Sequence, residues 1–144
     1  MSSEINDKHL SLIQGVVNRL AGNSFALKGW SVTLVSALLA LAAKDADARL
    51  VAIALLPALT FWGLDGYFLA QERLFRRLYE RVIDRDQSLP DFSLDPGSCP
   101  LRCWLQSARS STLLAFHGTI LLLVVLILSY LLLLAPAATP PPSG

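Results

Sequence analysis

The chain has 144 residues, of which 53% are hydrophobic and 16% charged, and its formal net charge is only +1. A nearly neutral chain lacks the basic footprint of nucleic-acid-binding proteins, so no nucleic-acid partner is expected. Three apolar stretches, residues 25–43, 50–70 and 113–135, are each long enough to cross a lipid bilayer. About 20 helical residues at ~1.5 Å each match a hydrocarbon core of ~30 Å. The composition therefore predicts an all-α integral membrane protein with three transmembrane helices.

The first segment, residues 1–22, is predicted to be an amphipathic helix on the cytoplasmic side. Its apolar positions repeat at helical spacing, at Leu10, Ile13, Val17 and Leu20. The sequence Gly-Asn-Ser at 22–24 is typical of a helix boundary, with Ser24 as the cap of the next helix. A cleaved signal peptide is not expected, because charged residues of both signs precede the first apolar stretch.

Residues 24–70 are predicted to form a transmembrane hairpin. Its two spans, 24–43 and 50–70, are joined by the polar turn 44–49. A connection this short makes the two helices antiparallel neighbours.

The second helix is predicted to continue beyond the membrane as a cytoplasmic stalk, residues 71–86. No Gly or Pro follows its membrane exit until Pro90, so nothing in the sequence ends the helix there. The stalk carries an apolar stripe formed by Leu74, Leu78 and Val82. Such a stripe needs a partner, either the N-terminal helix or a second copy of the chain. We therefore expect a homo-oligomer.

The remaining chain divides into three parts. Residues 87–103 contain three Pro and one Gly and are predicted to be a cytoplasmic loop. Residues 104–135 are predicted to form the third transmembrane helix with a short lead-in. The tail, residues 136–144, is uncharged and rich in Pro, which predicts a disordered external segment.

Lys and Arg residues predict the orientation, because they remain on the cytoplasmic side. Of the 12 Lys and Arg residues, only Lys44 and Arg49 lie in the turn between the first two spans. The others precede or enter the first span or lie between the second and third. The N-terminus is therefore predicted to be cytoplasmic and the C-terminus external. Three tryptophans lie toward the cytoplasmic ends of their helices, as an aromatic belt requires, and these are Trp30, Trp62 and Trp104.

Lys28 and Asp65 are charged residues inside apolar stretches, where ionisable side chains are costly and usually functional. Both are equally far along the chain from the middle of the 44–49 turn, so the hairpin should bring them to the same depth. One interpretation is an intramembrane ion pair that locks the hairpin. Another is a titratable or ion-binding site at Asp65. A third is a snorkelling Lys28 and an interfacial Asp65 that act independently.

Small residues mark candidate helix contacts in the first two spans, because they let membrane helices approach closely. The candidates are Gly29, Thr33, Ser36, Ala37 and Ala40 in the first span and Gly63, Gly66 and Ala70 in the second. Packing within the hairpin is the simplest interpretation. A subunit interface, or a pore wall with Thr33 and Ser36 facing water, is the alternative.

Other residues suggest no reaction. His117, early in the third span, is typical of a hydrogen-bonded interfacial residue, and Cys99 and Cys103 do not have the usual spacing of structural zinc ligands. No nucleotide-binding, hydrolase or metalloprotease motif occurs. We expect no metal, no cofactor and no enzymatic activity.

Two blocks, NSFALKGWSVTLVSALLALAA (23–43) and FWGLDGYFLAQERLFRRLYERV (61–82), resemble a family of small uncharacterised bacterial inner-membrane proteins, and STLLAFHG (111–118) fits the same family. The resemblance implies a helical fold in the bacterial inner membrane and no particular activity. By analogy alone, small multi-span proteins of this kind serve as membrane effectors in antiphage systems.

Three functional hypotheses follow. The first is a non-enzymatic membrane protein that self-associates into an ion-conducting or membrane-perturbing assembly, under the control of a cytosolic protein partner. The second is a structural or accessory membrane subunit without conduction. The third, a small ion- or proton-coupled transporter using Asp65, is less favoured because three spans are few for a transporter and no inverted repeat is visible.

Overall fold

The computed structural model of the protein describes residues 2–84 and 93–134. These residues form five helices, which are α1 (Ser2–Asp45), α2 (Ala48–Ile53), α3 (Leu55–Asp84), α4 (Leu101–Ala108) and α5 (Ser111–Leu134). Three helical stretches are long and apolar enough to cross a membrane, namely Asp7–Asp45, Ala48–Asp84 and Ser111–Leu133. The described part of the chain therefore confirms the prediction of an all-helical membrane protein with three candidate spans.

The helix α1 is continuous where two separate helices were predicted. The sequence Gly22-Asn23-Ser24 lies in its interior and does not break it. A glycine inside a helix costs only ~1 kcal/mol and no proline is present, so packing along a neighbouring helix is enough to keep the backbone helical. The Ser24 hydroxyl does not cap a helix but donates to Asp65.

The turn between α1 and α2 is closed by backbone and side-chain hydrogen bonds. Ala46 adopts a left-handed conformation with φ of 50°, and the Asp47 N–H donates to the Ala42 carbonyl over 3.1 Å. This is the Schellman arrangement that ends many helices. The Asp47 carboxylate then accepts from the Arg49 N–H over 2.8 Å and caps α2.

The second span is interrupted at Ala54, between α2 and α3, although one helix was predicted from Leu50 onward. Pro57 explains the interruption because it has no N–H to donate to the carbonyl four residues earlier, and its ring crowds that carbonyl. Beyond this point α3 continues without a break to Asp84. The predicted helical continuation of the second span is therefore confirmed as far as Asp84, its position outside the membrane stays a prediction, and the last two stalk residues lie outside the described part.

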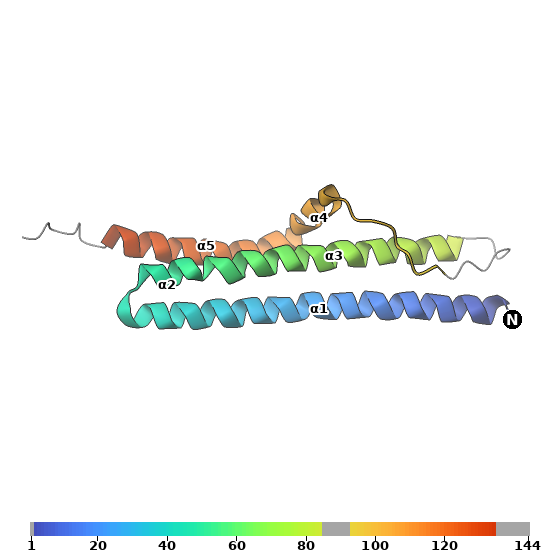
Figure 1. Ribbon diagram of the computed structural model, residues 1–144, viewed down its shortest axis with the longest axis horizontal. Helices are drawn as coiled ribbons and strands as arrows, with labels where there is room; N and C mark the ends of the chain where they lie inside the picture. The colour runs from blue at the N-terminus through green and yellow to red at the C-terminus, as the bar shows by residue number, and fades with distance from the viewer. Residues whose placement is uncertain (1, 85–92, 135–144) are drawn as a thin grey trace, which may run out of the picture.

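The stalk stripe is covered within the chain. α1 and α3 run side by side in opposite directions along most of their length (Figure 1). Leu74 and Leu78 are each only 7% exposed, and the facing half of α1 buries Ile13 and Val17. Val82 is partly exposed. Of the two partners expected for the stripe, the N-terminal helix provides the cover, so the stripe gives no reason for a second copy to bind there.

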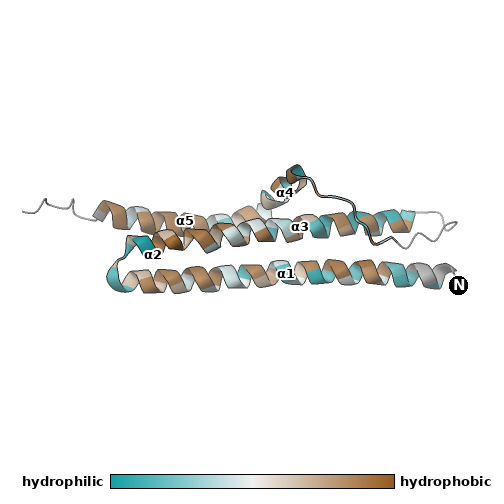
Figure 2. Cartoon of the chain, in the orientation of Figure 1, coloured by the Kyte–Doolittle hydropathy of each residue, from teal (hydrophilic) through white to brown (hydrophobic). Residues whose placement is uncertain are grey.

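The fifth helix makes one half of the molecule a three-helix bundle. α5 lies beside α2 and α3, and the core of this half consists of Val35, Ala42, Val51, Ala54, Ala58 and Val124. In the other half, the described helices are α1 and α3, and the irregular segment 93–100 runs along α3 there (Figure 1). Figure 2 shows more polar residues along that pair and a mostly apolar α5. With 24 residues, α5 is ~36 Å long, and it contains no charged residue. Its length and composition therefore match a bilayer core.

The segment between α3 and α5 begins its helix earlier than predicted. Residues 93–100 are irregular, and α4 begins at Leu101 rather than at Trp104 because Pro100 serves as its N-cap. A turn at Arg109 and Ser110 separates α4 from α5, so the lead-in to the third span is a helix of its own. The rest of the predicted loop, residues 87–92, and the predicted tail, residues 136–144, lie outside the described residues.

Candidate functional site

A buried polar cluster around Asp65 joins the three long helices. The Asp65 side chain on α3 has no exposed surface, and its Oδ2 lies 2.6 Å from Lys28 Nζ on α1 and 2.9 Å from His117 Nε2 on α5. Its Oδ1 accepts a hydrogen bond from the Ser24 hydroxyl, and Lys28 Nζ also donates to Ser24 Oγ over 2.9 Å. The structure thus brings together the predicted pair Lys28 and Asp65 and adds two residues to it.

Local sequence explains why the cluster forms. Ser24 and Lys28 are four residues apart on one face of α1, so both reach the same point on α3. His117 lies in the second turn of α5, at the depth that the hairpin gives to Asp65. Neither Ser24 nor His117 was predicted to belong to the site. The available indications were the four-residue spacing from Lys28 and the position of His117 just inside the third span.

The imidazole of His117 is held in one orientation. Its ring is stacked on Trp62, with centroids 6.2 Å apart and an interplanar angle of 9°, and the edge contact with Phe116 is 5.0 Å between centroids. The side chain is 1% exposed, and within the described residues Nδ1 has no hydrogen-bond partner. A neutral imidazole that donates from Nε2 to the carboxylate fits this arrangement, because Nδ1 then holds only a lone pair.

The cluster is closed around the carboxylate and accessible at one side. The Lys28 side chain is 20% exposed, whereas Asp65 and His117 are almost completely covered. Every Asp65 oxygen already accepts at least one hydrogen bond. Within residues 2–84 and 93–134, no three side chains of His, Cys, Asp or Glu are grouped to hold a metal ion. The geometry therefore suits a polar lock between helices better than an open ion-binding site.

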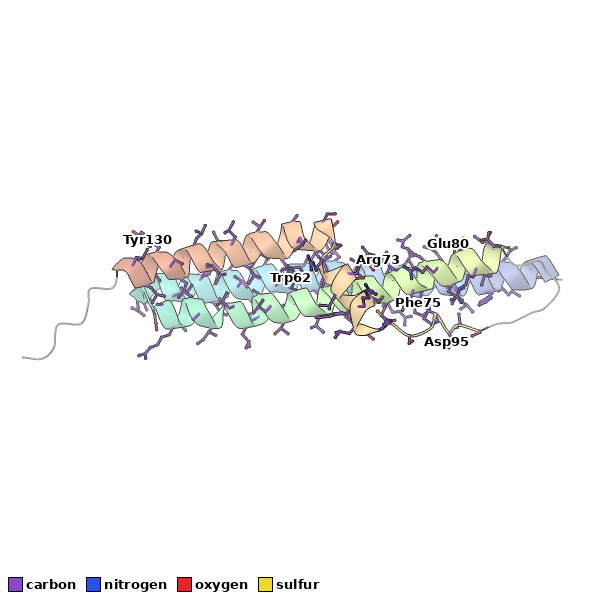
Figure 3. The ribbon with its side chains drawn as sticks, turned by 90° about the horizontal axis from the view of Figure 1, so that it is seen from above. Trp62, Arg73, Phe75, Glu80, Asp95 and Tyr130 are labelled. Carbon is purple, nitrogen blue, oxygen red and sulfur yellow. The ribbon has the colours of Figure 1, made fainter. Side chains whose placement is uncertain are left out.

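Two tryptophans fix α4 on α3 beside this cluster. Trp62 Nε1 donates to the Ala108 carbonyl over 2.9 Å, and Trp104 Nε1 donates to the Gly63 carbonyl over 3.0 Å. Arg73 donates to Ser107 Oγ over 3.3 Å, and Figure 3 shows Trp62 and Arg73 where α4 crosses α3. The indole N–H groups of Trp62 and Trp104 thus bond to the protein, and the aromatic belt stays a prediction. Of the three, only Trp30 is mainly exposed, at 60%.

The small residues of α3 serve the contact with α4. A Cβ atom added to Gly66 would lie 2.9 Å from Ala108 Cβ, so the two helices touch at this glycine. A Cβ atom on Gly63 would meet the Trp104 ring at 3.7 Å. Ala70 is fully buried. These residues are packing residues, as predicted, but Gly63 and Gly66 face α4 rather than α1.

The small residues of α1 are not covered by any other described helix. All five are exposed, namely Gly29, Thr33, Ser36, Ala37 and Ala40. The buried face of α1 carries Ser31, Val35 and Ala42 instead. Packing of the hairpin through the first set is therefore wrong, and the contact between α1 and α3 uses the opposite face of the helix. The alternative interpretations, a subunit interface or a pore wall, stay open for this face.

No protein-family model, curated protein or solved structure matches this chain. The resemblance carried by the blocks at 23–43 and 61–82 therefore stays a prediction.

Proposed function

We propose that this chain is a non-enzymatic protein of the bacterial inner membrane that self-associates and forms an ion-conducting assembly controlled by a cytosolic protein partner. The observation that carries the proposal is the outer face of α1, which we call the small face. Its members recur at seven-residue spacing and are all exposed: Gly15, Gly22, Gly29, Ser36 and Ala43 form one row, and Ala26, Thr33 and Ala40 form the row beside it.

The glycines of the small face contact no other described element of the protomer. A Cβ atom on Gly15, Gly22 or Gly29 would meet nothing within 4 Å, so none of them makes room for a neighbouring element of the chain. Each glycine in a helix interior costs about 0.5–1 kcal/mol relative to alanine. A closely approaching helix from a second copy would use that space, since small residues allow short distances between helix axes.

Contact with lipid does not account for this face. The row extends beyond the membrane half of α1, since Gly15 precedes the level at which α5 begins. In the proposed topology this position lies outside the bilayer, yet Gly15 continues the row with the same spacing. A repeat of seven residues is the period at which two helices stay in contact along their whole length by winding around each other. The α1 helix of a second copy accounts for the row both within the apolar part of α1 and at Gly15.

Conduction is supported by the polar groups of the same face. Thr33 and Ser36 are exposed within the apolar part of α1, and the Thr33 hydroxyl donates to the Gly29 carbonyl over 2.9 Å. Hydroxyl groups on the membrane half of an exposed helix suit a water-filled interface better than a lipid-facing one. Because Ser and Thr also pack at membrane helix interfaces, an accessory subunit without conduction would use the same residues, and current recordings decide between the two functions.

The proposed orientation has a cytoplasmic N-terminus and an external C-terminus. It is supported by the ten Lys and Arg residues outside the 44–49 turn. Fusions of an exported reporter and of a cytosolic reporter to residue 144 test it. Activity of the cytosolic reporter at that position would contradict the proposed topology.

Substitution in the small face tests self-association. Gly22→Leu with Gly29→Leu should convert the purified protein to a monomer in mild detergent, as measured by light scattering that subtracts the detergent mass. Ala115→Leu, an exposed position on α5, is the matched control and should leave the oligomer intact. A wild-type monomer, or an oligomer in the glycine double variant, would contradict the proposal.

Planar bilayer recordings test conduction separately. The wild-type protein should produce discrete current steps, and the glycine double variant should produce none. An oligomer that gives no current would leave the accessory-subunit function and exclude the conducting one. Currents abolished by Asp65→Asn in a stable oligomer would favour the transporter hypothesis instead.

A further inference from the structure

The short helix α4 lies at the level where the third span enters the membrane. α5 begins at Ser111, directly after the turn that ends α4, and it has the length of a bilayer core. In Figure 1, α4 leaves the line of the long helices at the junction between the three-helix half and the two-helix half. Its place in the chain therefore puts α4 at the boundary between hydrocarbon and water.

The two faces of α4 differ in character. The inner face is fixed on α3, where Ser107 is 1% exposed and Trp104 is hydrogen-bonded to Gly63. The outer face exposes Leu101 at 71% and Leu105 at 45%, one helical turn apart. Next to these two leucines the same face exposes Arg102, Gln106 and, in the turn that follows, Arg109.

The charge of this outer face is positive and uncompensated. α4 contains no acidic residue, and neither Arg102 nor Arg109 makes an ion pair with any residue that the structure describes. On the neighbouring stalk, Arg76 pairs with Glu72 over 2.8 Å and Arg73 donates to Ser107. Arg77 and Arg81 also make no ion pair with a described residue, but they have no exposed leucine pair on a separate short helix beside them. Two free guanidinium groups thus lie beside two exposed leucines.

We propose that α4 is an interfacial helix that binds anionic phospholipid. Leu101 and Leu105 insert between the acyl chains at the membrane boundary, and Arg102 and Arg109 bind the phosphate of the headgroups. A helix with an apolar edge and a basic edge lies in the plane of the interface in this way. Guanidinium groups form paired hydrogen bonds with phosphate oxygens, and a negatively charged membrane surface attracts them.

Two observations favour a lipid over other occupants of the same surface. A soluble phosphate would use the arginines but leave both leucines in water. A second protein would need a larger apolar area than two leucines on a helix of two turns provides. Only a phospholipid presents hydrocarbon and phosphate at the spacing and depth at which α4 presents leucine and arginine.

The depth of α4 is tested with spin labels on the full-length protein in liposomes that contain phosphatidylglycerol. Single labels are placed at Leu105→Cys and, as a water-exposed control on the stalk, at Arg81→Cys, both with Cys99→Ser and Cys103→Ser. Oxygen, which concentrates in the hydrocarbon, should relax the label at position 105 more strongly than a water-soluble nickel complex does. The label at position 81 should show the opposite preference. Equal access of nickel to both labels would overturn the proposal, and so would shielding of position 105 from both reagents, which indicates a protein contact.

The headgroup is tested on the chain with its native cysteines. Phosphatidylglycerol added to the protein in neutral detergent should raise the midpoint of thermal unfolding by several degrees, whereas phosphatidylcholine should not. Arg102→Gln with Arg109→Gln should lose most of this shift. Lys8→Gln with Arg81→Gln removes the same charge from α1 and the stalk, away from α4. This double variant should keep the full shift in the unfolding midpoint. An equal shift in both double variants, or the same shift with soluble glycerol phosphate, would overturn the proposal.

Discussion

Lys28 Nζ and Asp65 Oδ2 lie 2.6 Å apart across the interface of α1 and α3, and His117 Nε2 approaches the same oxygen from α5. One carboxylate thereby ties together all three long helices. Because Asp65 is buried, loss of any hydrogen-bond donor to its carboxylate costs folding free energy, since an ionised carboxylate in an apolar setting is stable only when it is paired.

The first prediction is a double-mutant cycle at this pair. Asp65→Asn should lower the free energy of unfolding by about 3 kcal/mol, because Lys28 loses its anionic partner and one of the two acceptor oxygens becomes an NH2 donor. Lys28→Met should cost less, since the carboxylate keeps Ser24 and His117 as donors. Lys28→Met with Asp65→Asn should recover at least ~1 kcal/mol relative to the sum. Strictly additive losses in detergent unfolding experiments would exclude the pairing.

The second prediction concerns His117. His117→Phe keeps an aromatic ring against Trp62 but removes the Nε2 donor, so unfolding should become easier by about 1–3 kcal/mol. Phe116→Leu keeps the Nε2 donor but removes the edge contact with the imidazole, so its loss measures the packing contribution alone. The loss at His117 should shrink when Asp65 is already Asn, and a constant loss would show that His117 acts by packing alone.

The third prediction compares two glycines of opposite surroundings. Gly66→Ala should destabilise the protein by about 1–3 kcal/mol, because its new Cβ would lie 2.9 Å from Ala108 Cβ and 3.1 Å from Ala108 Cα. Gly29→Ala meets open space and should stabilise the isolated protomer by about 0.5–1 kcal/mol through helix propensity. Thermal unfolding of both variants as monomers measures the difference. Equal effects would contradict the close crossing of α3 and α4.

The fourth prediction concerns the reactivity of Cys99. Burial, followed by the hydrogen bond and charge interaction with Cys103, raises the pKa of the Cys99 thiol to about 11 from its ordinary value of 9.0, although Arg77 acts in the opposite direction. The thiolate fraction at pH 8 should therefore be about a hundredfold below that of a free peptide thiol. Site-resolved alkylation followed by mass spectrometry measures it, and Cys103→Ser should accelerate the reaction.

The same pKa gives a stability effect of defined sign. Because folding raises the pKa of Cys99, its neutral form stabilises the folded state fully below pH ~9, and this contribution is lost as the pH rises through about 11. Cys99→Ser should flatten the alkaline part of the stability profile. An unchanged profile would indicate that the thiol is solvated like that of the unfolded chain.

Apolar length and the arrangement of charges along the chain were enough to predict the three spans, the tight hairpin and the meeting of Lys28 with Asp65. These depend on local quantities, because a helix rises by a fixed amount per residue and a short turn fixes which positions face each other. The unbroken course of α3 as far as Asp84 was predictable for the same reason, since no residue there ends a helix.

Only the tertiary structure decided how the faces of these helices are used. Helical spacing shows that Gly29, Thr33 and Ser36 share a face, but not which neighbour, if any, covers it. Helix α5 brings His117 to Asp65, and the turn before α5 places α4 against Gly66. Both are long-range contacts that no local sequence pattern indicates. The unbroken α1 likewise reflects packing along α3, which outweighs the weak preference of Gly22 and Asn23 for a boundary.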